Sequence, residues 1–269
     1  MKKILFTDLD ETLLKSDKTV SRENRRAIRR MLDAGHHLVV ATGRPVNSGL
    51  TVVRQLGLTL PGCYMIAFNG AVIYDCAADM ILNKRTLPIE HVEYLFEEAE
   101  RCGLHIQTYS DEYILAGRND KELEYYVQTT KMPYKIVKNM FASLEKEPCK
   151  VLLASLDEPE KLKRFQRQHR SWEEGKCSSF FSCREYLEYC PVDTDKGRGV
   201  RFLKEFLNVR TEDTYAAGDE RNDISMLREA GTGIAVRNAF EDVKMAADFI
   251  TANDNEHDAV AEIIDKFIL

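Results

Sequence analysis

The sequence has no apolar run long enough to cross a bilayer, and it has no excess of basic residues. Its 38 lysines and arginines are outnumbered by 44 aspartates and glutamates, which gives a net charge of −6 at pH 7. Non-specific nucleic-acid binding depends on surplus positive charge. A membrane-spanning helix needs about 20 apolar residues, and no secretory segment precedes the first expected strand. We therefore expect a cytoplasmic protein without nucleic-acid or membrane partners, and no obligate protein partner is evident.

The seven cysteines include no Cys-x-x-Cys pair and no repeated short spacing. An odd, scattered set indicates reduced thiols rather than a disulfide framework. It also gives little support to a zinc site on Cys177, Cys183 and Cys190. The sequence has no Gly-x-x-x-x-Gly-Lys-Ser/Thr loop, and no cysteine is followed by an arginine six residues later. These absences argue against a P-loop nucleotidase and a cysteine-dependent phosphatase.

Short apolar runs alternate with helical patterns near both ends of the chain. This alternation predicts an α/β fold with a doubly wound, mainly parallel, Rossmann-like sheet and helices on both faces. A helix is expected over residues 21–34 with Ser21 as its N-cap, and another runs from Pro45 to Gly57. The expected core strands are residues 4–7, 38–41, 64–68, 214–217, 233–236 and 249–251.

The alternation breaks after Asn69-Gly70, where helix–strand–strand groups replace it. These groups predict an α+β insert with an antiparallel sheet. Its expected strands are 104–109, 113–116, 151–155 and 179–183, after a hairpin of 71–74 and 80–85, and its expected helices are 89–102, 121–130 and 159–169. We therefore predict a discontinuous core domain, residues 1–85 and 190–269, and an inserted domain, residues 86–189. Small-molecule sites are common at such boundaries.

The first expected strand ends in carboxylates at alternate positions. Asp8, Asp10 and Thr12 leave the chain on the same side if the strand geometry persists. At the carboxyl end of a central strand, they would face the crevice where α/β sheets hold ligands. Two carboxylates brought together need a cation or a shared proton to relieve their repulsion. The alternative interpretation is an acidic surface turn after an edge strand.

Three further polar clusters follow expected strands. Thr42 and Gly43 precede a helix whose N-terminus would favour an anion, although Thr42 could instead be a helix N-cap. Lys196 could neutralise carboxylates and hold a phosphate, or it could simply be solvated. Asp219 and the pair Asn222-Asp223 bring more acids to the same edge, unless they only form a capping turn.

The four clusters together supply oxygen ligands for a hard divalent ion and a cation for phosphate. Oxygen-only ligands favour Mg²⁺ over zinc or copper. In order, the clusters resemble the four motifs of the haloacid dehalogenase superfamily. The motifs are Asp8-Leu9-Asp10-Glu11-Thr12, Thr42-Gly43-Arg44, Lys196-Gly197 and Gly218-Asp219-Glu220-Arg221-Asn222-Asp223. The chain is most similar to the Cof-type phosphatases of this superfamily, in which a large C2-type cap is inserted between the second and third motifs.

The resemblance implies a magnesium-dependent phosphomonoester hydrolase that forms an aspartyl-phosphate. Its substrate would be a small phosphorylated metabolite, with sugar phosphates favoured. Asp8 would be the nucleophile, and Asp10 would protonate the leaving oxygen and later deprotonate the attacking water. The catalytic set would be completed by Lys196. The metal would be held by Asp8, the Asp10 backbone carbonyl, Asp219 and Asp223.

The resemblance also implies which residues bind the phosphoryl group of the substrate. The group would be held by Thr42, Gly43, Asn69, Lys196 and Asn222. Thr12 would shape the loop rather than touch substrate. The chain departs from the family pattern at Glu220, Arg221 and Arg237, and the first two of these are expected to face outward.

Two alternatives use the same fold. One is a sugar phosphomutase, which shares the aspartyl-phosphate step but returns the phosphoryl group to the sugar. The other is a regulatory protein that binds a phosphorylated ligand with weak turnover or none. The presence of Asp8, Asp10, Lys196 and Asp219 weighs against the regulatory protein. The cap residues that set substrate specificity are not identified by the sequence.

Overall fold

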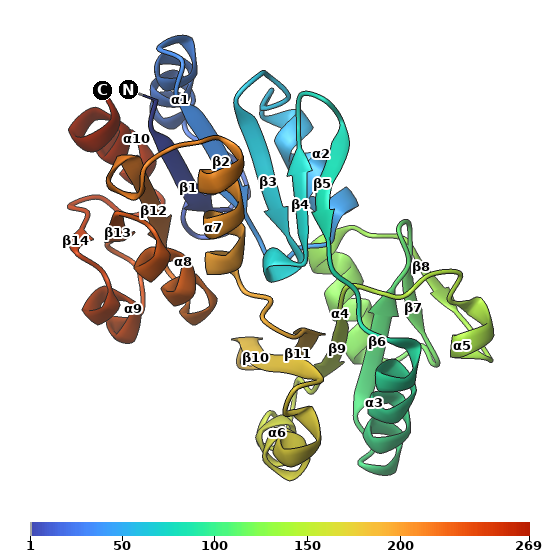
Figure 1. The fold of residues 1–269 in the computed structure, drawn as a ribbon. Helices are drawn as coiled ribbons and strands as arrows, with labels where there is room; N and C mark the ends of the chain where they lie inside the picture. Colours follow the sequence, from blue (N-terminus) through green and yellow to red (C-terminus); the bar gives the residue numbers. More distant parts are fainter. Residues whose placement is uncertain (1) are drawn as a thin grey trace. The chain divides into compact units, whose positions relative to one another are not determined.

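The chain folds around two separate β-sheets, one in each of two structural units (Figure 1). The computed structural model describes residues 2–269. The first unit contains residues 2–43, 49–83 and 195–269, and the second contains residues 44–48 and 84–194. The second unit therefore interrupts the first in sequence.

Eight strands form the first sheet, in the order β14-β13-β12-β1-β2-β3-β4-β5. They are β1 (Ile4–Asp8), β2 (His37–Ala41), β3 (Cys63–Ala67), β4 (Val72–Asp75), β5 (Met80–Lys84), β12 (Thr214–Gly218), β13 (Thr232–Ala235) and β14 (Phe249–Ile250). Neighbouring strands from β14 to β3 are parallel, and β4 pairs antiparallel with β3. The predicted mainly parallel α/β core is therefore confirmed.

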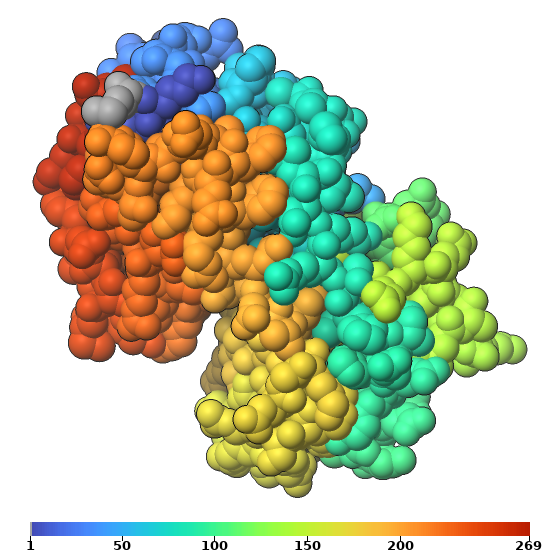
Figure 2. Space-filling model, in the orientation of Figure 1, coloured from blue at the N-terminus to red at the C-terminus, as the bar shows by residue number. Residues whose placement is uncertain are grey.

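Helices bury both faces of this sheet. They are α1 (Arg22–Asp33), α2 (Val46–Gln55), α7 (Lys196–Phe206), α8 (Ile224–Glu229), α9 (Glu241–Ala246) and α10 (Ala259–Ile263), with the short turns η1 (Phe68–Gly70), η2 (Thr211–Asp213), η3 (Arg221–Asp223) and η4 (Ile264–Ile268). Ile4 and Phe6 pack with Val200 and Leu203 of α7, and the orange segment that contains α7 lies at the surface of the view in Figure 2. Every residue of β1 is buried, as a strand covered on both faces requires.

Local chemistry explains where two of the predicted elements begin and end. Ser21 accepts a hydrogen bond from the backbone N–H of Asn24 at 3.0 Å, and Gly35 follows α1 with φ +86°. The predicted N-cap of the first helix is therefore confirmed. The strand expected over 64–68 lies one residue earlier, at Cys63–Ala67. Phe68 and Asn69 both have positive φ, which ends the extended strand before Phe68.

Six strands form the second sheet, in the order β10-β11-β9-β6-β7-β8. They are β6 (His105–Tyr109), β7 (Ile114–Ala116), β8 (Tyr134–Ile136), β9 (Val151–Ala154), β10 (Cys177–Cys183) and β11 (Tyr186–Pro191). The helices of this part of the chain are α3 (Ile89–Arg101), α4 (Lys121–Thr130), α5 (Met140–Ser143) and α6 (Glu160–Glu173). Buried residues of α3 and α6 pack with strand residues such as Ile106, Leu153 and Tyr189 in one core.

The prediction that this second sheet is antiparallel is wrong in one respect, because β7 and β8 are parallel. The helix α4 lies between them in sequence and returns the chain to the starting side, as a parallel pair requires. Sequence analysis also missed β8 and β11. The side chains of β8 are exposed. In β11, the acidic Glu188 interrupts the apolar pattern and is buried against Lys150, with 3.1 Å between Oε1 and Nζ.

All seven cysteines lie in the described part of the chain, and none of them forms a disulfide. Six are at least partly buried, and Cys102 is exposed. The expectation of reduced thiols stays a prediction. No helix within residues 2–269 combines the length and the hydropathy that a membrane span requires.

Candidate functional site

Asp8 is the last residue of β1, and the chain turns directly after it. Glu11 has φ +57°, and Asp10 forms an isolated bridge with Leu14. The condition for Asp8, Asp10 and Thr12 to share one side, that strand geometry persists to Thr12, is not met, because the strand ends at Asp8 and this turn follows. The turn still brings Thr12 into the site, where its hydroxyl donates to Asp219 Oδ1 at 2.6 Å.

Three carboxylates gather at the carboxyl ends of β1 and β12. One oxygen from each of Asp8, Asp219 and Asp223 lies within 4.8 Å of the others, and all three residues are buried. Lys196, the first residue of α7, inserts its ammonium group among them. It donates to Asp8 Oδ1 and, at 2.6 Å, to Asp223 Oδ1. Parallel pairing of β1 with β12 therefore brings together acids about 210 residues apart.

The loop after β12 is built around the Asp223 side chain. Asp223 Oδ2 accepts hydrogen bonds from the backbone N–H groups of Asp219 and Glu220, both at 3.0 Å. Gly218 lies so close that a Cβ at this position would be 2.5 Å from the Asp223 Cβ and Cγ. A side chain at residue 218 would therefore push Asp223 out of position.

The site has more negative charge than Lys196 can neutralise. Burial raises the pKa of Asp8 well above its usual range, against the lowering effect of the Lys196 ammonium. Burial and the neighbouring Asp223 raise the pKa of Asp219 to about 7. Burial opposes the charged form of Lys196, but Asp223 and Asp8 hold its pKa well above the usual value.

The donor set fits a hard divalent cation. Three ionised carboxylates and one ammonium leave two negative charges in a buried site, and buried charges of like sign are stable only when compensated. All the available side-chain donors are oxygens, which suits Mg²⁺ better than a soft metal. Asp8 Oδ2 and Asp219 Oδ2 take part in none of the hydrogen bonds described above. These two atoms are the ones best able to accept a metal ion.

Asp10 does not join this carboxylate cluster through its side chain. Its Oδ1 lies 3.2 Å from Lys18 Nζ, which also contacts Glu11 Oε1 at 3.0 Å. Sequence reasoning missed Lys18 because its contact depends on the turn from Asp10 to Lys18. Both Glu11 and Lys18 have positive φ in this turn.

The remaining predicted site residues form a second group beside β2 and β3. The N–H of Asn69 donates to the Thr42 carbonyl at 3.1 Å, and Asn222 Nδ2 donates to Asn69 Oδ1 at the same distance. A Cβ on Gly43 would be 3.0 Å from Asn69 Nδ2. Because α2 begins only at Val46, Thr42 is not the N-cap of that helix.

Asn222 has a buried polar atom with no partner. Among the described residues, nothing hydrogen-bonds to its Oδ1. Buried polar atoms usually have a partner, so an unpaired one is expected where a ligand or water binds. Beside it, Gly70 packs against the backbone of Asp195 so closely that a Cβ would overlap the Asp195 carbonyl. This contact holds η1 against the N-terminus of α7, whose first residue is Lys196.

The two residues that depart from the family pattern in this loop behave differently. Arg221 is exposed, and its Nε donates to Asp242 at 2.6 Å, as expected for an outward-facing side chain. Glu220 folds back instead, and its Oε1 accepts from the backbone N–H of Arg221 at 3.0 Å. The expectation that Glu220 faces outward is therefore wrong, because its carboxylate caps η3.

The fold and this site define a class of protein. The family described as haloacid dehalogenase-like hydrolase matches residues 5–264, which is nearly the whole chain. The chain belongs to this family and is a phosphatase of the Cof-like type, as the motif order predicts. The buried triad Asp8, Asp219 and Asp223 is consistent with the divalent-metal site typical of these enzymes.

Individual relatives match over nearly their full length. The chain is 28% identical to the Bacillus subtilis 5-amino-6-(5-phospho-D-ribitylamino)uracil phosphatase YitU, covering 98% of this chain and 97% of that protein. It is 27% identical to the phosphatase YwpJ of the same organism, covering 95% and 96%. A crystal structure of a haloacid dehalogenase-like hydrolase from Bacteroides thetaiotaomicron is 31% identical. It covers 99% of both chains with a TM-score of 0.90.

Proposed function

We propose that this protein is a magnesium-dependent phosphomonoester hydrolase that forms an aspartyl-phosphate. The observation that carries the proposal is the buried Asp8 carboxylate. One of its oxygens accepts a hydrogen bond from Lys196, and the carboxylates of Asp219 and Asp223 lie close by. A buried aspartate at position 8 does not stabilise the core, because burial disfavours its charged form. A nucleophile that must approach an anionic phosphate is one reason to keep such a group.

Asp8 and Asp10 divide the chemistry in two steps. In the first, one carboxylate oxygen of Asp8 bonds to phosphorus, the bond from phosphorus to the ester oxygen breaks, and Asp10 gives that oxygen a proton. In the second, a water oxygen bonds to phosphorus, the bond from phosphorus to the Asp8 carboxylate oxygen in this acyl phosphate breaks, and Asp10 takes a proton from the water. In the structure, Asp10 Oδ1 lies 3.2 Å from Lys18 Nζ.

Asp8, the Asp10 carbonyl and Asp219 are the residues that hold Mg²⁺, with Asp223 beside them. Bound there, the ion supplies positive charge that offsets the charge on the phosphoryl oxygens. The two oxygens of Asp223 already accept hydrogen bonds from Lys196 and from the backbone. We therefore assign Asp223 the positioning of Lys196, and its carboxylate would complete the negative charge around the ion.

The phosphoryl oxygens are bound by the second group of site residues together with Lys196. Thr42 and the backbone of Gly43 lie against Asn69, and Asn222 bridges to Asn69 with its other amide atom unpaired. Thr42, the Gly43 backbone, the Asn69 amide nitrogen and Lys196 supply hydrogen-bond donors and one fixed positive charge, the arrangement that stabilises charge developing on a transferring phosphoryl group. The unpaired Asn222 Oδ1 is an acceptor, so Asn222 contributes by holding Asn69 and by orienting a water. Thr12 orients Asp219 and does not contact substrate.

The substrate class is a small phosphorylated metabolite, with sugar phosphates favoured. Three relatives from Bacillus subtilis, 26–28% identical, are named as phosphatases of 5-amino-6-(5-phospho-D-ribitylamino)uracil, a phosphate ester on a sugar-alcohol chain. The substrate named for these relatives and the sugar phosphates both carry the phosphate on a polyhydroxylated carbon chain. We propose that residues 86–189 form the cap that recognises the part of the substrate beyond the phosphate.

The first experiment is phosphate release from p-nitrophenyl phosphate, with and without Mg²⁺. We expect release only with Mg²⁺, and Asp8→Asn should abolish it while keeping the shape of the side chain. Asp265→Asn is the matched control, because Asp265 is exposed and pairs only with Arg30. Equal release by the wild type and the Asp8→Asn variant would refute the proposed nucleophile.

A second experiment tests the substrate class. A panel of sugar phosphates, sugar-alcohol phosphates, nucleotides and phosphopeptides should give the highest kcat/KM for sugar and sugar-alcohol phosphates. Release in ¹⁸O-labelled water, followed by phosphorus NMR, should place one label in each inorganic phosphate released in a single turnover. Label-free transfer to a second sugar hydroxyl would identify a phosphomutase instead, and activity on phosphopeptides alone would contradict the substrate class.

A further inference from the structure

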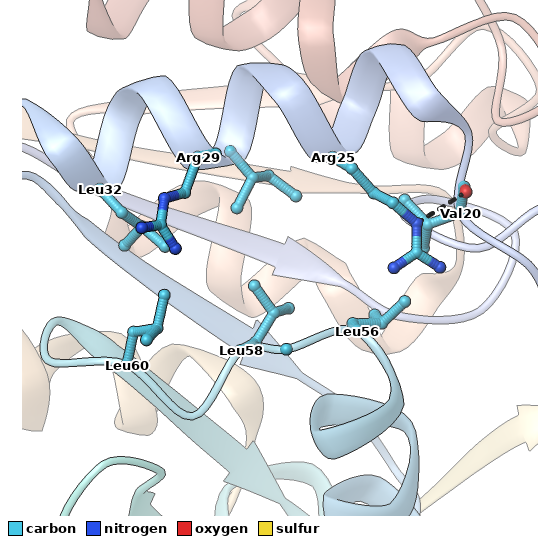
Figure 3. Close-up of a pocket in the computed structure, with 9 residues that line it drawn as sticks. Val20, Arg25, Arg29, Leu32, Leu56, Leu58 and Leu60 are labelled. Atoms are coloured by element: carbon cyan, nitrogen blue, oxygen red, sulfur yellow. Dashed lines mark hydrogen bonds between the residues drawn. The ribbon is translucent and has the colours of Figure 1, made fainter.

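A groove with nonpolar walls lies between α1 and the loop that follows α2, in the first unit (Figure 3). It has a volume of about 220 Å³. Its nonpolar walls are formed by Val20, Ile28, Leu32, Leu56, Leu58 and Leu60. No residue to which we assign a catalytic, metal-binding or phosphate-binding role lines it. The groove is therefore a feature of the molecule that the phosphatase chemistry does not explain.

Two arginines extend from α1 across this groove. Arg25 and Arg29 are four residues apart and therefore lie on one face of the helix. Both side chains reach toward the loop that carries Leu56, Leu58 and Leu60 (Figure 3). Two positive charges therefore border a surface that is otherwise nonpolar.

The guanidinium of Arg25 is held in place but is not neutralised. Its Nε donates to the Val20 carbonyl at 3.2 Å, which orients the group and uses only one of its nitrogens. Within residues 2–269, no carboxylate pairs with Arg25. Arg29 differs, because its Nε lies 3.1 Å from Asp33. Arg25 is therefore the residue of the groove best placed to bind an anion.

The size and chemistry of the groove define what it can hold. A dry protein cavity of about 150 Å³ accommodates benzene, so the space here suits one ring with a short side chain. A guanidinium binds a carboxylate through paired, charge-assisted hydrogen bonds. Although the chain has a net charge of −6, the Arg25 guanidinium supplies a local positive charge that favours an anion at the groove.

We infer that this groove is a binding site for a small amphipathic carboxylate. The nonpolar body lies between Ile28 and the Leu56–Leu60 loop, and the carboxylate is bound by Arg25. The inference does not depend on the proposed function, because binding needs neither Mg²⁺ nor a phosphate ester. Its failure would leave the phosphatase mechanism unchanged.

The test uses the full chain and 3-phenylpropanoate as the probe, with 3-phenylpropanamide as its uncharged counterpart. Titrations followed by ¹H–¹⁵N NMR should give saturable shifts confined to residues 20–32 and 56–60. The amide should bind about tenfold more weakly, because it cannot form the charge-assisted pair with Arg25. Isothermal titration in the absence of Mg²⁺ gives the two affinities.

Variants separate the charge from the nonpolar walls. Arg25→Gln should weaken carboxylate binding about tenfold and leave amide binding unchanged. Arg26→Gln is the matched control, because Arg26 is an exposed neighbour that does not line the groove. Leu60→Trp fills the groove and should remove binding of both probes, with circular dichroism confirming that the variant is folded.

Three results would overturn the inference. The first is a lack of saturable binding by 3-phenylpropanoate at millimolar concentration. The second is equal affinity for acid and amide, which would identify a nonpolar surface without anion recognition. The third is a set of shifts in the same residues that depends on protein concentration alone, which would assign the groove to a second copy of the chain.

Discussion

Lys196 Nζ donates a 2.6 Å hydrogen bond to Asp223 Oδ1, and both side chains are completely buried. The same ammonium also bonds to Asp8. Lys196 is therefore the only positive side chain described within a group of three buried carboxylates. Removing one member of such a network leaves uncompensated buried charge, which costs more than the network contributes. This asymmetry underlies the predictions below.

Replacing Lys196 should cost both stability and activity. Lys196→Met keeps the length of the side chain but leaves Asp8 and Asp223 without their hydrogen-bond donor. We expect a loss of about 3–5 kcal/mol in the free energy of unfolding without metal, measured by urea denaturation. Added Mg²⁺ should restore more stability to the variant than it adds to the wild type, because the ion compensates the same charges.

The control for that measurement is Lys204→Met. Lys204 is on the same helix and pairs with Glu229 at 2.7 Å near the surface. We expect a change of at most about 1 kcal/mol. A similar loss in both variants would show that Lys196 is an ordinary helix residue.

The stability of the metal-free protein should fall as the pH rises from about 4 to about 7. The pKa of Asp219 is raised in the folded state to about 7, from an ordinary value of 3.8. The folded state therefore binds more protons than the unfolded state across this window. By linkage, stability decreases with increasing pH there.

Thermal unfolding with EDTA at several pH values, compared with Asp219→Asn, isolates this contribution. The Asn variant should lack this part of the decline, because its amide does not ionise. Its Oδ1 can still accept the Thr12 hydroxyl. Parallel pH profiles for the two proteins would contradict the raised pKa. For the wild type, affinity for Mg²⁺ should increase through the same window, since the metal binds the carboxylate form.

Gly218→Ala should disrupt the site although it adds only a methyl group. The added Cβ would lie 2.5 Å from the Asp223 side chain, which is buried and bonded on both oxygens. We expect a destabilisation of about 1–3 kcal/mol and a loss of phosphatase activity beyond what that destabilisation explains. Gly117→Ala is the control, because no atom lies within 4 Å of its Cβ position. Full activity in Gly218→Ala would show that Asp223 tolerates displacement.

Thr12→Val should weaken Mg²⁺ binding without changing the fold. The hydroxyl of Thr12 donates to Asp219 at 2.6 Å, and this bond favours the ionised carboxylate that a metal needs. A hydrogen bond to a charged group contributes about 1.5–3 kcal/mol, so affinity should fall about tenfold or more in a calorimetric titration. Thr12→Ser keeps the hydroxyl and should bind Mg²⁺ like the wild type. If the Val variant bound Mg²⁺ with the affinity of the wild type, Thr12 would have no role in metal binding.

The course of β1 and the start of α1 could be predicted from local patterns. An apolar run of four residues and a serine before a helical pattern are chemical features that act within a few residues. The strand β11 could not be predicted in this way. The burial of its central Glu188 is compensated by Lys150, 38 residues away, and by the Ser182 hydroxyl, which donates to Glu188 Oε1. Burial of a charge depends on its partner, and a local pattern does not contain that partner.

The candidate site shows the same division. The motif order correctly predicts the family, and the structure brings Asp8, Asp219 and Asp223 together. The catalytic roles of these residues stay predictions. The contact of Asp10 with Lys18 had no signal in the sequence, because it depends on two residues with positive φ in the turn between them.

By itself, the sequence determined the class of this protein: a mainly parallel α/β hydrolase with acids at the ends of its core strands. Strand and helix patterns and motif order are carried by neighbouring residues, so they can be recognised without the fold. Only the tertiary structure decided which charges meet. The fold of the first unit places Lys196 of α7 between Asp8 and Asp223, and it places Arg25 of α1 beside the nonpolar groove. Such contacts join distant parts of the chain, and their energies depend on burial that exists only after folding.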